Sequence, residues 1–173
     1  MALGAIAALS IAAPYRMARF TSWWNPYADA QGTGFQVIHG QQALGSGGWW
    51  GVGLGGSREK WGTLPEAHTD FIYAVLGEEL GIIGTILVLL IFTAIAIVGL
   101  RIARGTNEAF IQIAALGIVT WIVTQALVNI GAVLGILPIT GVPLPLVSYG
   151  GSSLIPTLLA MGILMAFAKH EDY

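Results

Sequence analysis

The sequence has no cysteine and little charge, since charged residues make up only 9% of its 173 positions. The absence of cysteine excludes a disulfide framework and a thiolate metal site. A soluble domain carries about 25% charged residues, whereas here no charged residue occurs between Glu108 and Lys169. With 55% hydrophobic residues, the composition indicates a membrane protein. The net charge of -2 and the lack of a basic patch argue against a nucleic-acid partner.

Three apolar runs are long enough to cross a bilayer, which takes about 20 residues in a helix. They predict an all-α integral membrane protein, a polytopic bundle with transmembrane helices over residues 79–100, 109–134 and 150–168 and a cytoplasmic tail over residues 169–173. Residues 1–13 are too short to span, because they rise only about 20 Å, and they lack the basic start of a signal peptide. We interpret them as the end of a longer span and residues 14–78 as a long extracytoplasmic loop. The chain is then the C-terminal half of a larger protein, or a truncated reading frame.

The basic residues orient these spans. Arg101 and Arg104 lie in a short loop, Lys169 follows two spans later, and residues 135–153 contain neither Lys nor Arg. Short loops that carry Lys and Arg are cytoplasmic. The 135–153 loop and the acidic stretch before the first span are therefore expected on the same outer face, where they can form one site. Because this loop is apolar and rich in proline and glycine, it must be buried in protein or line a cavity.

The stretch before the acidic residues is rich in glycine and tryptophan. Residues 15–64 hold five of the six tryptophans, which favour the membrane–water interface. Gly51, Gly53 and Gly56 match a dinucleotide fingerprint, but the strand and helix that this fingerprint requires are missing. We expect instead a tight backbone that another segment or a ligand approaches closely.

Residues 64–81 hold four of the nine acidic residues. Thr63 and Glu66 fit a capping box, which predicts a helix start there. Glu66 and Asp70 would then lie one turn apart, so that at least one binds a proton more tightly, and Asp70 becomes a candidate general base. The alternatives are a capping role for Glu66 and a water-facing carboxylate for Asp70. Glu78 and Glu79 are expected to flank the span and mark the membrane interface.

Several other side chains are candidates for binding substrate near this carboxylate. Hydroxyls and glycine N–H groups at the end of the 135–153 loop suit an anionic group, although a simple turn with an N-cap is the alternative. Gln125 and Asn129 are expected to hydrogen-bond between helices. No metal site is predicted. The candidate binding residues are Arg58, Lys60, Glu66, His68, Ser148, Gly150, Gly151 and Ser152.

Three motifs together resemble the SEDS family, the peptidoglycan polymerases of division, elongation and sporulation (FtsW, RodA and SpoVE). They are GSGGWWGVGLGGS at residues 45–57, LPEAHTDFIYAVLGEELG at residues 64–81 and LPITGVPLPLVSYGGSS at residues 137–153. The sequences of the second and third motifs are closer to the FtsW branch of the family than to the RodA branch. The resemblance covers essentially the whole chain and implies the C-terminal half of a fold of about ten spans.

The resemblance implies an inverting peptidoglycan glycosyltransferase that polymerises lipid II in cell division and cell-shape maintenance. Asp70 matches the family's essential aspartate and would deprotonate the acceptor hydroxyl. The implied partners are lipid II, an undecaprenyl-diphosphate-linked glycan, a class B penicillin-binding transpeptidase and division proteins. The implied location is the bacterial inner (plasma) membrane, with an extracytoplasmic active site, at the division septum. This half alone is not expected to catalyse.

One position departs from some relatives, which carry a lysine where this chain has Thr140. Arg58, Lys60, a residue of the other half or a divalent cation would have to stabilise the pyrophosphate instead. Two other functions remain open at this point. One is a lipid II transporter (flippase), which needs polar residues at the bilayer midplane, and the other is a non-catalytic divisome scaffold, which does not need Asp70.

Overall fold

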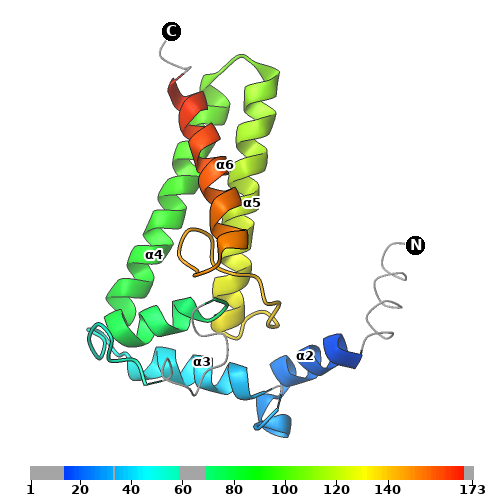
Figure 1. Cartoon of the computed structure of the whole chain (residues 1–173), viewed down its shortest axis with the longest axis vertical. Helices are drawn as coiled ribbons and strands as arrows, with labels where there is room; N and C mark the ends of the chain where they lie inside the picture. Colours follow the sequence, from blue (N-terminus) through cyan, green and yellow to red (C-terminus); the bar gives the residue numbers. More distant parts are fainter. Residues whose placement is uncertain (1–13, 33, 59–68, 170–173) are drawn as a thin grey trace.

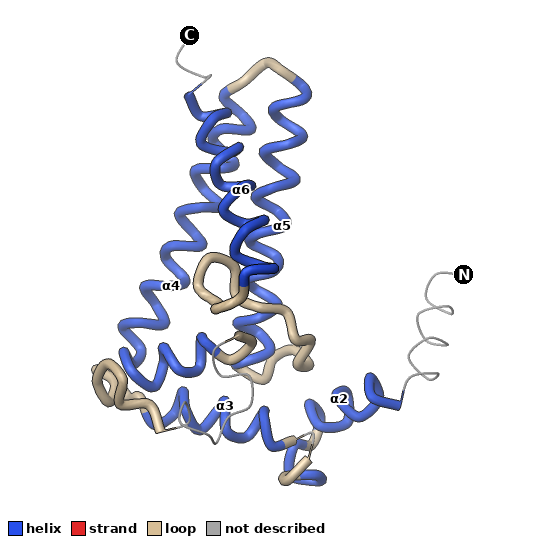
Figure 2. Tube along the Cα trace, viewed as in Figure 1, coloured by secondary structure: helices blue, strands red, loops and turns tan. Residues whose placement is uncertain are grey.

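The three apolar runs fold into three long helices: α4 (Ile72–Gly105), α5 (Ala109–Val133) and α6 (Gly151–Lys169). Each is long and apolar enough to cross a membrane. The computed structural model describes residues 14–32, 34–58 and 69–169, and in it the three helices stand side by side as a bundle (Figure 1). The described part of the chain is helical with connecting loops and contains no strand (Figure 2). The predicted all-α, multi-pass fold is confirmed.

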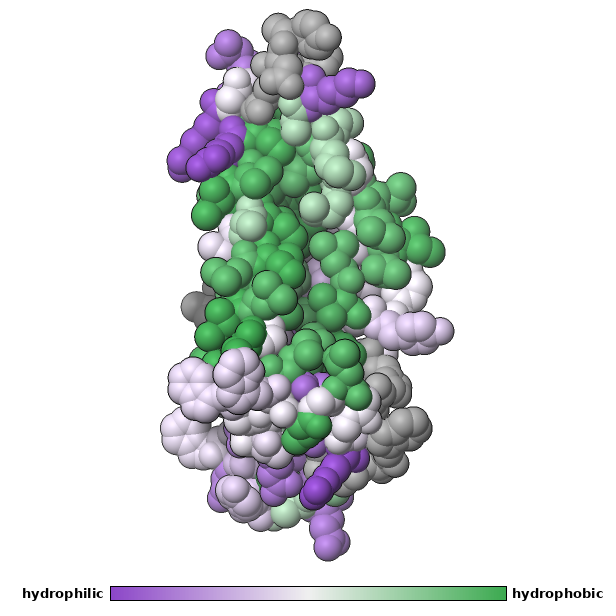
Figure 3. Space-filling model, turned by 90° about the vertical axis from the view of Figure 1, so that its left-hand side faces the viewer, coloured by the Kyte–Doolittle hydropathy of each residue, from purple (hydrophilic) through white to green (hydrophobic). Residues whose placement is uncertain are grey.

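Small side chains let α4 and α5 approach closely. A Cβ at Gly99 of α4 would overlap the side chain of Val119 on α5, and Ala115 and Ala126 of α5 are fully buried. Such small residues are typical of helix contacts in membranes. Many large apolar side chains are exposed on the outer surface of the bundle, where Figure 3 shows a hydrophobic band between two more polar ends.

Residues 14–78, predicted as one long loop, contain helices of their own. α2 (Pro14–Trp24), the short 3₁₀ helix η1 (Pro26–Asp29) and α3 (Phe35–Ser46) lie across one end of the bundle (Figure 1). The first turns of α4 pack on α3 before α4 turns into the bundle. The end of the bundle is therefore covered by helices that run across it.

α4 is broken at Gly81, whose φ of 67° and ψ of -163° are non-helical. The glycine-rich loop supplies the hydrogen bonds that the break removes. Val52 N donates to the Glu78 carbonyl at 2.9 Å and Gly53 N to the Glu79 carbonyl at 3.1 Å, while Ile82 N donates to the Gly48 carbonyl at 2.9 Å. The expectation of a backbone that another segment approaches closely is confirmed, and that segment is α4.

Glu78 was expected to flank the span as an interface residue, but its side chain is only 2% exposed and contacts protein. The Ser57 hydroxyl donates to Glu78 Oε2 at 2.5 Å, and Arg58 N donates to Oε1 at 3.1 Å. A buried carboxylate needs such donors to offset its lost hydration. Glu79 is buried as well. Glu78 therefore holds the end of the glycine-rich loop against α4.

The sequence predicts a helix that starts at Thr63 and continues through Asp70, but the described residues 69–71 are not helical. α4 begins at Ile72, and Thr69 to Phe71 form a turn. The capping box of Thr63 and Glu66 lies outside the described residues. Asp70 therefore precedes the helix, and the argument that placed it on a helical face one turn after Glu66 does not hold.

The contact between the glycine-rich loop and α4 predicts two sensitive glycines. A Cβ at Gly51 would overlap the Glu79 carbonyl, and one at Gly81 would press on the backbone of Trp49 and Gly51. Both glycines also have positive φ, at 77° and 67°. We expect Gly51→Ala or Gly81→Ala to cost at least about 1–3 kcal/mol of stability. Thermal unfolding of the full-length protein in detergent measures this.

Gly45→Ala is the matched control, since Gly45 lies in α3 with no atom within 4 Å of an added Cβ. That substitution should be neutral or stabilise by up to about 1 kcal/mol. Equal melting temperatures for all three variants would contradict the assignment of Gly51 and Gly81 as contact positions.

Candidate functional site

The loop between α5 and α6 is short of backbone donors, because Pro138, Pro143 and Pro145 have no N–H group. Its carbonyls still need partners where they are buried. Side chains from α2 and α5 provide them. Trp23 Nε1 donates to Gly135 O at 2.8 Å, Arg19 Nη1 to Ile139 O at 3.1 Å, Asn129 Nδ2 to Val142 O at 2.7 Å and Gln125 Nε2 to Pro143 O at 2.9 Å.

The amide side chains of Gln125 and Asn129 on α5 have a different role from the predicted one. Gln125 and Asn129 were expected to join helices, but their described partners are backbone carbonyls of loop segments. The loop is thereby attached to α2 on one side and to α5 on the other. Leu144 and Pro145 at its centre are fully buried, so the middle of this irregular segment is enclosed by protein, as expected, while Ile136 and Tyr149 near its ends are exposed.

Asp70 is held through its backbone by the same loop region. Asn129 Nδ2 also donates to the Asp70 carbonyl at 2.8 Å. One residue earlier, the Ser148 hydroxyl donates to the Thr69 carbonyl at 2.6 Å and accepts a hydrogen bond from Leu144 N at 2.7 Å. Two consecutive carbonyls are thus fixed by two buried side chains. The expectation that the acidic stretch and the 135–153 loop meet at one end of the bundle is confirmed.

The Asp70 carboxylate lies beside the guanidinium of Arg19. A Cβ at Gly141 would stand 3.3 Å from Asp70 Oδ2 and 3.5 Å from Arg19 Nη1. The acid and the cation therefore flank the same glycine, whose φ of 73° also disfavours any other residue. This places a cation from α2, a carboxylate from the turn before α4 and a glycine of the loop at one point.

Arg19 was not among the side chains that the sequence nominated. The sequence showed only that Arg19 follows soon after an apolar segment. A basic residue in such a place is usually an interface anchor. Its role becomes visible when α2 folds across the end of the bundle and brings it to the Pro-rich loop, 120 residues further along the chain. No local pattern in the sequence predicts this contact.

The other nominated residues are distributed differently. Ser148 is buried and its hydroxyl is engaged on both sides, so it is poorly placed to bind substrate. Gly150, Gly151 and Ser152 form the start of α6, where the Gly150 carbonyl accepts from Ser153 N and Leu154 N. Arg58 is exposed and meets Glu78 through its backbone N–H. Lys60, Glu66 and His68 lie outside the described residues.

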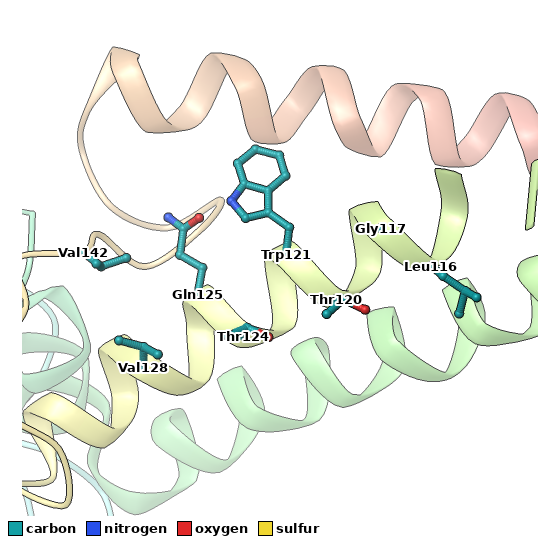
Figure 4. Close-up of a pocket in the computed structure, with 8 residues that line it drawn as sticks. All are labelled: Leu116, Gly117, Thr120, Trp121, Thr124, Gln125, Val128 and Val142. Carbon is teal, nitrogen blue, oxygen red and sulfur yellow. The ribbon is translucent and has the colours of Figure 1, made fainter. Parts of the chain in front are cut away.

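Two hollows adjoin the loop on the α5 side. One, of about 280 Å³, is lined by Gln125, Pro143, Ser152 and Ser153 together with Trp121 and Pro156. The other, of about 710 Å³, runs along α5 from Leu116 to Val142 of the loop (Figure 4). Figure 4 shows Trp121 and Gln125 on the α6 side of this groove. The start of α6 thus opens onto an apolar surface and not onto Asp70.

Comparison with known proteins agrees with this architecture. Stage V sporulation protein E of Bacillus subtilis is 46% identical over 99% of this chain and 47% of its own length. The probable peptidoglycan glycosyltransferase FtsW of Coxiella burnetii is 44% identical over 98% of this chain and 46% of its own length. The chain therefore spans about half the length of these relatives.

A solved structure shares the fold. It is described as "Structural coordination of polymerization and crosslinking by a peptidoglycan synthase complex", and it superposes with a TM-score of 0.70 at 28% identity, over 98% of this chain and 48% of that one. The cell cycle protein family that comprises FtsW, RodA and SpoVE matches residues 1–173. With this match over its whole length, the chain belongs to the FtsW/RodA/SpoVE family.

Proposed function

We propose that this chain is the C-terminal part of an inverting peptidoglycan glycosyltransferase that polymerises lipid II, with Asp70 as general base. The observation that carries the proposal is that the Asp70 carboxylate and the Arg19 guanidinium both lie against Gly141 at one end of a membrane bundle. The relatives named probable peptidoglycan glycosyltransferase FtsW support the reaction class. A membrane-end carboxylate that is held in place and set beside a cation is typical of a functional site.

In the proposed reaction, the Asp70 carboxylate accepts the proton of the acceptor's GlcNAc 4-hydroxyl. The oxygen then forms a bond to the anomeric carbon of the donor glycan. The bond from that carbon to the carrier's pyrophosphate breaks, its electron pair leaves with undecaprenyl diphosphate, and the α-linkage inverts to β-1,4. Since the leaving group supplies the driving force, the reaction needs no ATP on the outer face.

Arg19 is the proposed cation for the pyrophosphate. A guanidinium presents paired N–H donors that match phosphate oxygens, and Arg19 flanks Gly141 together with the Asp70 carboxylate. It would serve where some relatives carry a lysine at the position of Thr140. A divalent cation fits this place less well, because the described residues gather no group of three metal-binding side chains and a guanidinium already stands beside the carboxylate. We therefore assign no step to a metal.

The site geometry gives less support to a transporter or a scaffold. The amide N–H groups of Gln125 and Asn129 donate to carbonyls of the Pro-rich loop and of Asp70, so these side chains support the site at one end of the bundle. A scaffold would not need a carboxylate and a cation held at one glycine. The proposed setting is the bacterial inner membrane at the division septum, with division proteins and a class B penicillin-binding transpeptidase as partners.

Asp70→Asn in the full-length protein should abolish most lipid II polymerisation. General-base catalysis contributes roughly 10²–10⁴-fold, and the amide cannot take the proton. Glycan strands made by the protein with its transpeptidase in detergent are the measurement. Glu108→Gln, at the opposite end of the bundle, is the matched control and should keep its activity. Undiminished polymer from Asp70→Asn would show that Asp70 is not the base.

Arg19→Ala should lower the polymerisation rate by roughly tenfold or more, since a hydrogen bond to a charged group contributes about 1.5–3 kcal/mol. Arg19→Lys should restore only part of it, because an ammonium lacks the paired donors. Arg104→Gln removes an exposed cation in the last turn of α4 and should have no effect. If all three variants polymerise at the same rate, Arg19 does not bind the leaving group.

Ser148→Ala distinguishes a positioning role from the predicted substrate contact. Loss of its bond to the Thr69 carbonyl should displace Asp70, so kcat should fall while KM for lipid II stays constant. Ser148→Thr, which keeps a hydroxyl, should recover part of the rate. Ser46→Ala removes a hydroxyl on exposed α3 and is the control. A raised KM with unchanged kcat would instead favour direct binding of substrate.

A further inference from the structure

The glycine-rich loop exposes an uninterrupted set of large apolar side chains. Trp49 is 70% exposed, Trp50 83%, Val52 49% and Leu54 83%. No charged residue occurs in residues 45–57. A soluble protein rarely leaves such a cluster in water, and a cluster of this kind marks a binding surface or a membrane contact.

The loop is fixed to the point where α4 bends. Its backbone pairs with the carbonyls of Glu78 and Glu79 and with the N–H of Ile82. At its far end, Ser57 binds the buried carboxylate of Glu78. The tryptophans therefore keep a defined height relative to Gly81, where α4 turns into the spanning bundle.

The exposed cluster adjoins the exposed apolar surface of α4. Directly after Gly81, α4 exposes Ile82, Ile83, Ile86 and Leu87. Figure 3, which faces this side, shows nearly neutral side chains gathered where the hydrophobic band ends. Tryptophan prefers this level of a bilayer, because its ring is apolar and its N–H needs a polar partner.

We propose that residues 49–54 insert into the outer leaflet at the boundary of headgroups and acyl chains, and that this contact sets the height of Asp70. Asp70 lies directly before the first turns of α4, which end at the same bend. The height-setting part rests on the proposed function, in which the substrates are themselves held by the bilayer at a fixed depth. The insertion itself does not.

A lipid surface suits this cluster better than a fitted protein partner. The side chains lie on a protruding loop and not in a groove, and they offer no charge for a salt bridge. A fluid leaflet can accommodate such a tip without shape matching. Continuity with the spanning face of α4 places the tip where that leaflet begins.

Site-directed spin labelling measures the insertion directly and does not depend on catalytic activity. Single cysteines replace Trp50 or Leu54 in the full-length protein, which is reconstituted in phosphatidylethanolamine–phosphatidylglycerol vesicles, and collisions with oxygen and with a water-soluble nickel chelate are compared. Labels at both positions should meet oxygen more than nickel. Ala28 in η1, on the side of the outer helices away from the bundle (Figure 1), is the control and should show the reverse.

Nickel accessibility equal to that at Ala28 would overturn the proposal. Shielding from both reagents that occurs only when a transpeptidase is added would also overturn it, in favour of a protein contact. Because the labels report depth alone, loss of insertion is distinguishable from failure of the glycosyltransferase proposal.

A paired substitution tests the height-setting role. Trp49→Ser with Trp50→Ser should lower polymerisation several-fold in vesicles but leave it unchanged in detergent, where no bilayer fixes the substrate. Trp49→Phe with Trp50→Phe keeps apolar rings and should retain activity in both media. An equal loss in vesicles and detergent would show that the loop acts through folding and not through the bilayer.

Discussion

The excess of backbone carbonyls over N–H donors in the loop between α5 and α6 determines how the outer end of this protein is built. Three prolines remove donors from a segment whose centre is buried in protein. Buried carbonyls without partners are costly, so side chains from elsewhere must supply the hydrogen bonds. Trp23 and Arg19 come from α2, and Gln125 and Asn129 come from α5. Satisfying the loop is what brings these elements together.

The same hydrogen bonds place the candidate catalytic group. Asn129 Nδ2 donates to two carbonyls, that of Val142 in the loop and that of Asp70. The Ser148 hydroxyl of the loop donates to the carbonyl of Thr69, the residue before Asp70. Each of these side chains therefore serves the fold and the site at once. These supports give a defined position to a carboxylate that is carried on a turn before the helix.

Features that depend on composition along the chain were predictable, and features that depend on burial between distant segments were not. The described bounds of α5 and α6 differ from the predicted ranges by one residue at most, because an apolar run of spanning length has few other structures open to it. The burial of Glu78 was not predictable, since nothing in its neighbourhood reveals that Ser57 will cover it. Arg19 was missed because its partner lies in another loop. The turn of Thr69 and Asp70 before α4 was missed because its contacts come from distant parts of the chain.

The bend at Gly81 divides α4 into two arms, a short one that begins beside Asp70 and a long one that runs through the bundle. An ordinary glycine kink is a hinge, because the hydrogen bonds lost at the break leave the two arms free to swing. Here the glycine-rich loop bonds to both sides of the break, and its close packing leaves no room for a Cβ at Gly51 or Gly81. The corner therefore resists bending. The bilayer or a neighbouring helix can tilt the spanning arm. Because the angle at Gly81 is fixed, the short arm beside Asp70 then rotates together with the spanning arm.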